Sequence, residues 1–383
     1  MNPTGERGSG RLRLKPFEKK LIAIGFAVII AAAGFTIYFN ENAPHAGGNS
    51  LVIYVYNSFL AYGPSYQEAY NTVFGTFEKA YGVSIVLKNI SAAYLLLTLV
   101  AQKSNPQADL VIGLTESNGM QAIYDGVLQK FSSTADPYIN SSLLADMGPA
   151  ASYLTPYEYS YLGIDFNKSN PSGPEFSPSF PGLLSQGNLS NLIIENPTLS
   201  DTGQEFLLWE ISYYEYLMKA NWTAWWNASM PVISSNKNIY QSWGSAFNQF
   251  ESNGTARSLL VSYLTDPAYN YYFGYGNYTG STATQYNGTE YGWRTIYNIG
   301  IVNGSSKLSL DRKFINYFLN STVQNAIPTN EWMFPANSTV DLPVSYSVLP
   351  NQSNIVPLNN YLNALTIYRD LPTWVQEWFD LYG

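Results

Sequence analysis

Residues 51–59, LVIYVYNSF, form a short apolar and aromatic run that is typical of a buried β-strand. A helical pattern follows at 64–82, PSYQEAYNTVFGTFEKAYG, which begins with a proline and ends with a glycine. The pattern then continues as VSIVLKNI at 83–90, AAYLLLTLVAQK at 92–103 and ADLVIGL at 108–114. This alternation of strand and helix is typical of βαβ units, so the sequence predicts an α/β protein with a mostly parallel sheet flanked by helices.

The middle of the chain repeats the pattern. NLIIENP at 191–197 reads as a strand, and the segments 203–220 and 242–254 read as helices. ARSLLVSYLTDPAY at 256–269 reads as a strand that runs into a turn. We therefore expect two lobes, with the strands of 51–114 and those of 192–264 on separate sheets. The strand-rich segments 155–167 and 259–269 are the candidate crossings between the lobes.

Ligands of parallel α/β sheets bind at the carboxyl ends of the strands. In the first lobe these ends are expected at 57–59, 90–91 and 115–116.

Composition excludes several kinds of site. The 383 residues contain no cysteine and one histidine, but 32 tyrosines and 9 tryptophans. Thiolate chemistry and cysteine metal sites are excluded, and His45 lies in a linker-like segment, so histidine triads and His-rich metal centres are excluded too. We expect no metal and no cofactor.

The first forty residues form a separate unit. Residues 1–20 carry six Arg and Lys residues and read as a cytoplasmic basic segment, followed by an uncharged stretch at 21–39, LIAIGFAVIIAAAGFTIYF. That stretch is long enough to cross a bilayer, and the basic flank keeps the N-terminus cytoplasmic. An uncleaved anchor is favoured over a cleaved signal because a signal core is usually shorter. After a linker at 40–50, the rest of the chain is expected on the outside of the cell.

The charge balance and the glycosylation sequons characterise the part of the chain from Pro44 onward, which is expected outside the cell. Six of the 19 basic and three of the 27 acidic residues precede Pro44, which leaves 13 against 24, a net charge of −11. This balance makes nucleic acid an unsuitable partner.

Thirteen N-x-S/T sequons predict N-linked glycans on a surface protein, and the composition resembles that of archaea from acidic habitats. The sequons begin at Asn89, Asn140, Asn167, Asn188, Asn221, Asn227, Asn253, Asn277, Asn287, Asn303, Asn320, Asn337 and Asn351.

Five segments together resemble the thiamine-binding proteins of ABC importers, a family of bilobed extracellular solute-binding proteins. In chain order they are IYVYNSF (53–59), PYEYSYLGIDFNK (156–168), ENPTLSDTG (195–203), LLVSYLTDPAY (259–269) and QNAIPTNEWMFP (324–335). The resemblance implies a two-lobed periplasmic-binding-protein-like (type II) fold that delivers a small ligand to an ABC permease and is not an enzyme. The implied division is 51–157 and 266–340 for lobe 1, 158–265 for lobe 2, and 341–383 for a C-terminal helical segment.

The same resemblance implies aromatic walls around the ligand, which would be thiamine or a thiamine phosphate. A planar, permanently cationic ligand suits flat aromatic faces, because the ring quadrupole attracts cations. The implied wall residues are Tyr56, Tyr62, Tyr263, Tyr269 and Trp332.

The segment PTLSDTGQEFLLWE also opens a helix at which Ser200 and Gly203 could hold a phosphate. The alternative is that Ser200 is an ordinary N-cap, and Asp201 would repel a phosphate.

Other positions depart from the family pattern. Ser91 stands where the family has the acidic residue that recognises the aminopyrimidine, and Asn57 replaces an aspartate. Glu158 replaces another aspartate conservatively, and the second-lobe tryptophan of the family falls near Ile239 or Tyr240.

Two further interpretations stay open beside a solute-binding protein for this or another small organic ligand. Glu158, Glu116 and Asp266 could form an acid/base pair of the kind that glycosidases use. A glycosylated cell-surface protein without a small ligand would also have the anchor and the sequons.

Overall fold

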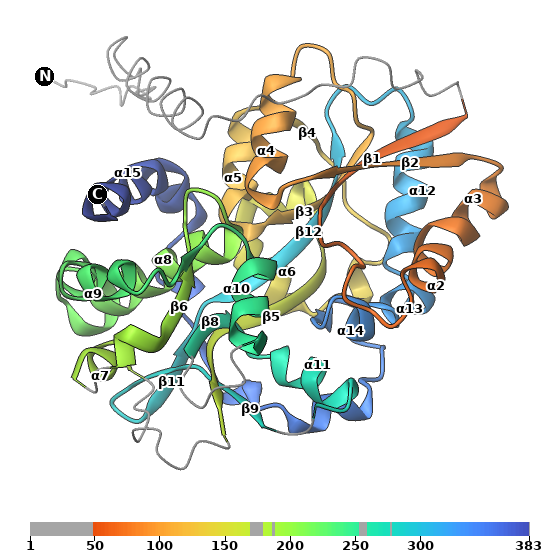
Figure 1. Cartoon of the computed structure of the whole chain (residues 1–383). Helices are drawn as coiled ribbons and strands as arrows, with labels where there is room; N and C mark the ends of the chain where they lie inside the picture. The colour runs from red at the N-terminus through yellow and green to blue at the C-terminus, as the bar shows by residue number, and fades with distance from the viewer. Residues whose placement is uncertain (1–48, 169–178, 186–187, 253–258, 276–277, 383) are drawn as a thin grey trace, which may run out of the picture. The chain divides into compact units, whose positions relative to one another are not determined.

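The computed structural model describes residues 49–168, 179–185, 188–252, 259–275 and 278–382 (Figure 1). The expected basic segment, the anchor at 21–39 and most of the linker lie outside these ranges. Within them, no helix combines the length and the apolar character that a membrane crossing requires.

Eleven strands of the described residues form one mixed sheet, whose main path runs in the order β2-β1-β3-β12-β5-β8-β6-β7; β4 pairs with β12, and β9 and β13 pair with β5. The first three strands are parallel to one another, as the βαβ pattern predicts, and β6 is parallel to both β7 and β8. The strands of this sheet are β1 (Ser50–Tyr56), β2 (Ser84–Ile90), β3 (Leu110–Thr115), β4 (Leu128–Gln129), β5 (Leu154–Asn167), β6 (Leu192–Glu195), β7 (Ile239–Tyr240), β8 (Leu259–Tyr263), β9 (Thr279–Thr282), β12 (Arg294–Val302) and β13 (Phe334–Pro335). A small second sheet holds β10 (Thr284–Tyr286), β11 (Thr289–Gly292) and β14 (Val356–Pro357).

The expectation of two separate sheets is wrong. Strand β5 has 14 residues, and its first half pairs with β12 while residues 162–166 pair with β8. Both of these pairings are antiparallel, and β12 is also antiparallel to β3. One long strand therefore belongs to both sets of strands and joins them into a single hydrogen-bonded sheet. The lobe boundaries expected from the sequence stay a prediction.

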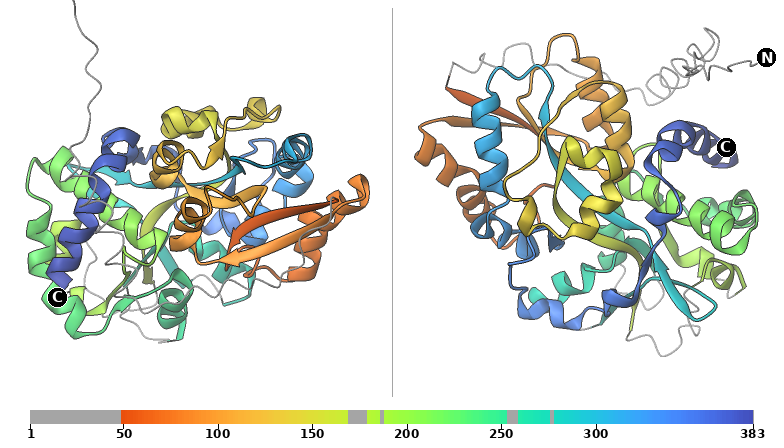
Figure 2. Two further views of the ribbon diagram at one scale, coloured as in Figure 1. Left: turned by 90° about the horizontal axis from the view of Figure 1, so that it is seen from above. Right: turned by 180° about the vertical axis from the view of Figure 1, so that it is seen from behind.

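Helices cover the sheet. Helix α4 packs against β1 and β3, and α12 packs against β12. The C-terminal helix α15 packs against both α5 and α9, and the two views of Figure 2 show it, in blue, beside the green helices. The helices are α2 (Tyr66–Tyr70), α3 (Thr76–Tyr81), α4 (Ala92–Ala101), α5 (Glu116–Tyr124), α6 (Ser141–Met147), α7 (Phe180–Ser185), α8 (Asp201–Ser212), α9 (Thr223–Ser235), α10 (Trp243–Ser252), α11 (Asp266–Tyr272), α12 (Leu308–Phe318), α13 (Ser321–Gln324), α14 (Ile327–Asn330) and α15 (Ala364–Tyr382).

Aromatic side chains fill the space between helices and sheet. Phe74 stacks on Phe314 at a centroid distance of 5.9 Å, beside β12. On the other side of the molecule, the rings of Trp225 and Trp226 meet edge to face at 4.8 Å, and Trp378 of α15 reaches Trp226 at 5.8 Å. The high tyrosine and tryptophan content thus serves packing as well as any binding site.

Two of the predicted glycosylation sites are corrected by burial. Asn337 is 4% exposed, and its side-chain amide donates a hydrogen bond to the carbonyl of Leu319. Asn188 is 5% exposed. A buried amide cannot carry a glycan in the folded chain, because a glycan is bulky and needs the surface. Asn253 and Asn277 lie outside the described residues.

Candidate ligand-binding site

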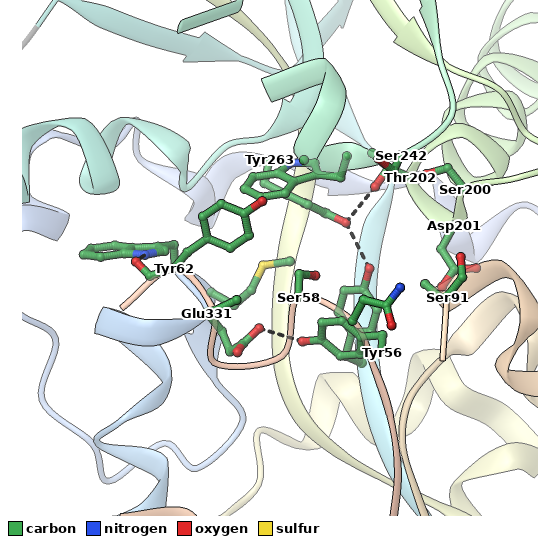
Figure 3. A pocket seen from close by; sticks show the side chains of 18 of the residues that line it. Tyr56, Ser58, Tyr62, Ser91, Ser200, Asp201, Thr202, Ser242, Tyr263 and Glu331 are labelled. Carbon is green, nitrogen blue, oxygen red and sulfur yellow. Dashed lines mark hydrogen bonds between the residues drawn. The ribbon is translucent and has the colours of Figure 1, made fainter. Parts of the chain in front are cut away.

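One pocket of about 370 Å³ is lined by the last residues of β1 and β8 and by mid-strand residues of β5 and β12, together with loop residues, and its volume is within the usual size range of small-molecule sites (Figure 3). Two groups of elements enclose it, and we name them the first and second walls. The first wall consists of Tyr56, Asn57, Ser58, Ala61, Tyr62, Ser91, Ala92, Glu158, Glu331, Trp332 and Met333. The second wall consists of Leu199, Ser200, Asp201, Thr202, Ser242, Trp243, Gly244, Tyr263, Asp266 and Tyr297.

Buried carboxyl groups organise the first wall. The hydroxyl of Tyr56 lies 2.6 Å from Oε2 of Glu331 and 3.1 Å from Oε1 of Glu158, and the amide of Leu60 donates to Oε1 of Glu331. A phenol has a single hydrogen and cannot donate fully to two carboxylates, so this arrangement favours a proton on one of the two carboxyls. Burial raises the pKa of Glu331 to about 8. Burial, followed by the charge of Glu331, raises the pKa of Glu158 well above its usual value.

These bonds fix the loop that follows β1. Leu60 has a φ of 60°, a left-handed conformation that is uncommon for residues other than glycine. The hydrogen bond from the Leu60 amide to the Glu331 carboxyl holds that conformation. The same loop carries Asn57 and Tyr62 into the pocket. The indole of Trp332 donates to the carbonyl of Tyr62 at 3.0 Å. The segment 331–333 and the loop after β1 are therefore held together.

The second wall begins at helix α8. Ser200 is its N-cap, with an extended backbone, and its side chain accepts a bond from the amide of Gly203. The same hydroxyl donates to Oε2 of Glu195, the last residue of β6. Asp201 follows as the first helical residue and is 7% exposed. Its Oδ2 has no hydrogen-bond partner, and burial raises the pKa of its carboxyl to about 7.

A chain of hydroxyl groups continues this wall. Thr202 and Tyr263 are 3.1 Å apart at their hydroxyl oxygens, and Tyr263 and Tyr297 are also 3.1 Å apart (Figure 3). Tyr297 belongs to β12 and stacks on Tyr56 at a centroid distance of 5.5 Å. The two walls thus meet at β12, the strand that lies in the middle of the sheet.

The aromatic faces come from both walls. Tyr62 of the first wall meets Trp243 of the second wall edge to face at 4.9 Å. The Trp243 indole donates to Ser262 at 2.8 Å, and Ser262 in turn donates to Asp266. These bonds orient an indole whose ring stacks on Phe247 at 4.8 Å.

Eight of the eleven side chains predicted to bind ligand line this pocket, namely Tyr56, Asn57, Tyr62, Ser91, Glu158, Ser200, Tyr263 and Trp332. Their role in binding stays a prediction.

The structure places the other three residues outside the pocket lining. Gly203 faces the backbone of Glu195, because a Cβ there would lie 2.6 Å from that carbonyl oxygen. Tyr240 ends strand β7 and packs against the cluster that includes Phe247. Tyr269 lies behind Trp332, with the two rings edge to face at 5.4 Å.

The pocket also contains residues that were not predicted. Trp243, three positions after Tyr240, lines the pocket. Glu331 immediately precedes Trp332 in the motif that identified the loop, which was a usable signal. No sequence signal pointed to Tyr297, because its position depends on the pairing of β12 with distant strands.

The carboxyls of the enzyme interpretation do not all gather in this pocket. Glu158 and Asp266 line it, whereas Glu116 accepts bonds from the Trp293 indole and the Ile296 amide elsewhere in the core. In the part of the chain that the structure describes, no group of three or more acidic, histidine or cysteine side chains is arranged to hold a metal ion.

Known proteins resemble this chain along most of its length. No protein-family model matches the sequence. The thiamine-binding periplasmic protein of Salmonella typhimurium is 24% identical over 343 residues, which cover 88% of this chain and 94% of the relative. The solved structure of a periplasmic thiamin binding protein superposes with a TM-score of 0.72 at 22% identity, covering 87% of this chain and 96% of the other.

The fold is shared with proteins of other ligands. A periplasmic binding protein from Actinobacillus pleuropneumoniae, solved with fructose-6-phosphate, gives a TM-score of 0.69 at 16% identity and covers 86% of this chain and 98% of its own. All three proteins are named as binding proteins and not as enzymes, in line with the expectation from sequence. The expected resemblance to the thiamine-binding proteins of ABC importers is therefore confirmed, and the chain has the α/β fold of the bilobed periplasmic solute-binding proteins.

Proposed function

We propose that this chain is the solute-binding protein of an ABC importer and that it binds thiamine or a thiamine phosphate in the pocket between the two walls. The observation that carries the proposal is the combination of aromatic rings and carboxyls in one pocket. Tyr62, Trp243 and Trp332 line it together with Glu158 and other acidic residues. The chain that folds this pocket resembles thiamine-binding proteins over nine tenths of their length.

The chemistry of the pocket suits such a ligand. Aromatic faces attract a thiazolium cation by about 0.5–2 kcal/mol for each contact. Oε2 of Glu158 is buried without a hydrogen-bond partner, so it is free to accept a bond from an amino group. A hydrogen bond of this kind contributes about 0.5–1.5 kcal/mol.

A second candidate is another small cationic ring compound. Asn57 and Ser91 line the pocket at positions where the family pattern has acidic residues. Their amide and hydroxyl groups can both donate and accept hydrogen bonds, so they would fit a different pattern of ligand edges. Mass spectrometry of the ligand released from the denatured native protein distinguishes the two candidates.

Transport requires a membrane partner. We propose that the loaded protein docks on an ABC permease driven by a separate ATPase, with the pocket on the outer side of the membrane. Residues 51–157 and 266–340 would form one lobe and 158–265 the other. The antiparallel pair of β5 and β12 would then connect them. Anchoring through 21–39 and glycans on exposed sequons belong to the same proposal.

Calorimetric titration with thiamine tests the proposal. Tyr62→Ala removes one aromatic face, and we expect affinity to fall by about 3- to 30-fold, which corresponds to a lost cation–π contact. The matched control is Tyr66→Ala, four positions along the chain, because Tyr66 is 49% exposed and is not part of the pocket lining. No heat of binding with thiamine or its phosphates would refute the proposed ligand. Equal losses of affinity in both variants would show that thiamine does not bind in this pocket.

A further inference from the structure

The charged groups that line the pocket all have one sign. Among the described lining residues, four are acidic and none is Lys, Arg or His; the acidic ones are Glu158, Asp201, Asp266 and Glu331. Phosphate groups are normally held by Arg, Lys or free backbone amides. This pocket therefore offers a phosphate no cationic side chain.

The start of helix α8 is one place where a phosphate could bind, and its side-chain hydroxyls are already engaged. The hydroxyl of Ser200 donates to Glu195. Thr202 is paired with Tyr263 at 3.1 Å, and Gly203 is packed against the backbone of Glu195. The helix end thus has no free hydroxyl to present.

What this helix end does present is a carboxyl group. Asp201 lines the pocket, is 7% exposed, and has an Oδ2 atom without a hydrogen-bond partner. Figure 3 shows it at the pocket between the first turn of α8 and the segment that carries Ser91. Oε2 of Glu158, which is 1% exposed, is a second unpartnered acceptor in the same pocket. Two buried oxygens without donors suit a ligand that brings donors or positive charge.

We propose that the pocket selects cations without a phosphate group, and that Asp201 is the specificity-determining residue that rejects phosphate. The inference rests on the proposed function in one respect only, the choice of thiamine as the cation. Within that function, free thiamine is the ligand, and its mono- and diphosphate are excluded. Like charges across a binding site discriminate strongly, because the wrong ligand must desolvate both charges without compensation.

Calorimetric titrations with thiamine, its monophosphate and its diphosphate test this inference. They are made at pH 8, above the pKa of about 7 to which burial raises Asp201. We expect the native protein to bind the monophosphate at least about tenfold more weakly than thiamine. Asp201→Asn should reduce that ratio by about tenfold, because it removes the repelling charge and adds a donor. Asp201→Ser is the second variant if the first does not fold.

The matched control is Asp311→Asn. Asp311 is also a buried carboxyl whose pKa is raised by burial to about 7 and which has an unpartnered oxygen, but it does not line the pocket. Its substitution should leave the ratio unchanged. Equal or tighter binding of the monophosphate by the native protein would overturn the inference, as would an Asp201 variant with an unaltered ratio.

Thermal melts with inorganic pyrophosphate test the repulsion without thiamine. Against chloride of matched ionic strength, pyrophosphate should raise the melting temperature of Asp201→Asn and leave that of the native protein unchanged. An equal rise in the native protein would overturn the inference. If no thiamine compound binds at all, the proposed function fails, and this arm still decides whether the pocket rejects phosphate.

Discussion

Two carboxyl groups, one from each wall of the pocket, are used in different ways. In the first wall, Glu331 accepts bonds from Tyr56 and from the Leu60 amide, so its carboxyl joins segments of the protein to one another. In the second wall, Oδ2 of Asp201 has no partner. The difference separates two roles that look alike in a sequence. One carboxyl maintains the shape of the site, and the other is available to a ligand.

The aromatic residues show the same division. Trp332 is 4% exposed and packs against Tyr269, Tyr272 and Phe273, whereas Trp243 is only partly buried. The family resemblance implied that Trp332 is an aromatic wall of the ligand site. Its burial means that this ring also supports the first wall.

The largest effect is expected from Trp332→Ala. Loss of a buried tryptophan should lower the free energy of unfolding by about 3–5 kcal/mol. It also removes the bond to the Tyr62 carbonyl. Urea unfolding of the variant measures the loss, and Trp332→Phe, which keeps most of the ring packing, should lose clearly less. A variant with native stability would show that the Trp332 ring contributes only to ligand binding.

The pH dependence of stability tests the carboxyls of both walls together. Burial raises the pKa of Glu331 and of Glu195 from 4.5 to about 8, and that of Asp201 from 3.8 to about 7. Between these values the folded state keeps protons that the unfolded state has lost, so the free energy of unfolding falls as pH rises. From pH 5 to pH 8 each of the three groups should contribute a fall on the order of 3 kcal/mol, since one pKa unit corresponds to about 1.4 kcal/mol.

Urea unfolding at the two pH values measures this fall. Glu195→Gln should make the dependence shallower, because it removes one of the buried acids. Stability that is flat or that rises between pH 5 and pH 8 would contradict the prediction, and with it the idea that these carboxyls are protonated in the folded chain.

A direct comparison of Glu331→Ala with Asp201→Ala sharpens the contrast between the walls. The first substitution leaves the Leu60 amide and the Tyr56 hydroxyl without their acceptor, so we expect a loss of about 2–3 kcal/mol. The second removes a carboxyl whose Oδ2 is unpartnered, and the loss should stay below about 1 kcal/mol. Thermal melts of both variants at pH 6 show which substitution loses more stability. The reverse order would show that Asp201, and not Glu331, is the structural carboxyl.

Local patterns predicted the individual elements well. The strand expected at 51–59 is β1, which ends at Tyr56, and the helices expected at 92–103 and 242–254 are α4 and α10. Ser200 begins α8 as an N-cap, as its place before DTG indicated. Such features depend on neighbours within a few residues, so the sequence contains the information needed to place them.

The join between the two sets of strands could not be predicted in this way. β12 at 294–302 had no counterpart among the expected elements, yet it lies in the centre of the sheet, between β3 and β5. Its partners are more than 125 positions away in the chain, as in the pairing of Tyr297 with Glu158. Pairing at that distance is decided by the closure of the whole fold and not by a local pattern.

The sequence by itself therefore determined the α/β class, the family resemblance and eight of the side chains that line the pocket. Only the tertiary structure decided how each of these side chains is used. Whether a buried carboxyl has a donor, as Glu331 does, or lacks one, as Asp201 does at Oδ2, depends on groups that the fold brings from distant segments. A residue's type fixes which bonds it can make, but the three-dimensional arrangement fixes which of them remain free for a ligand.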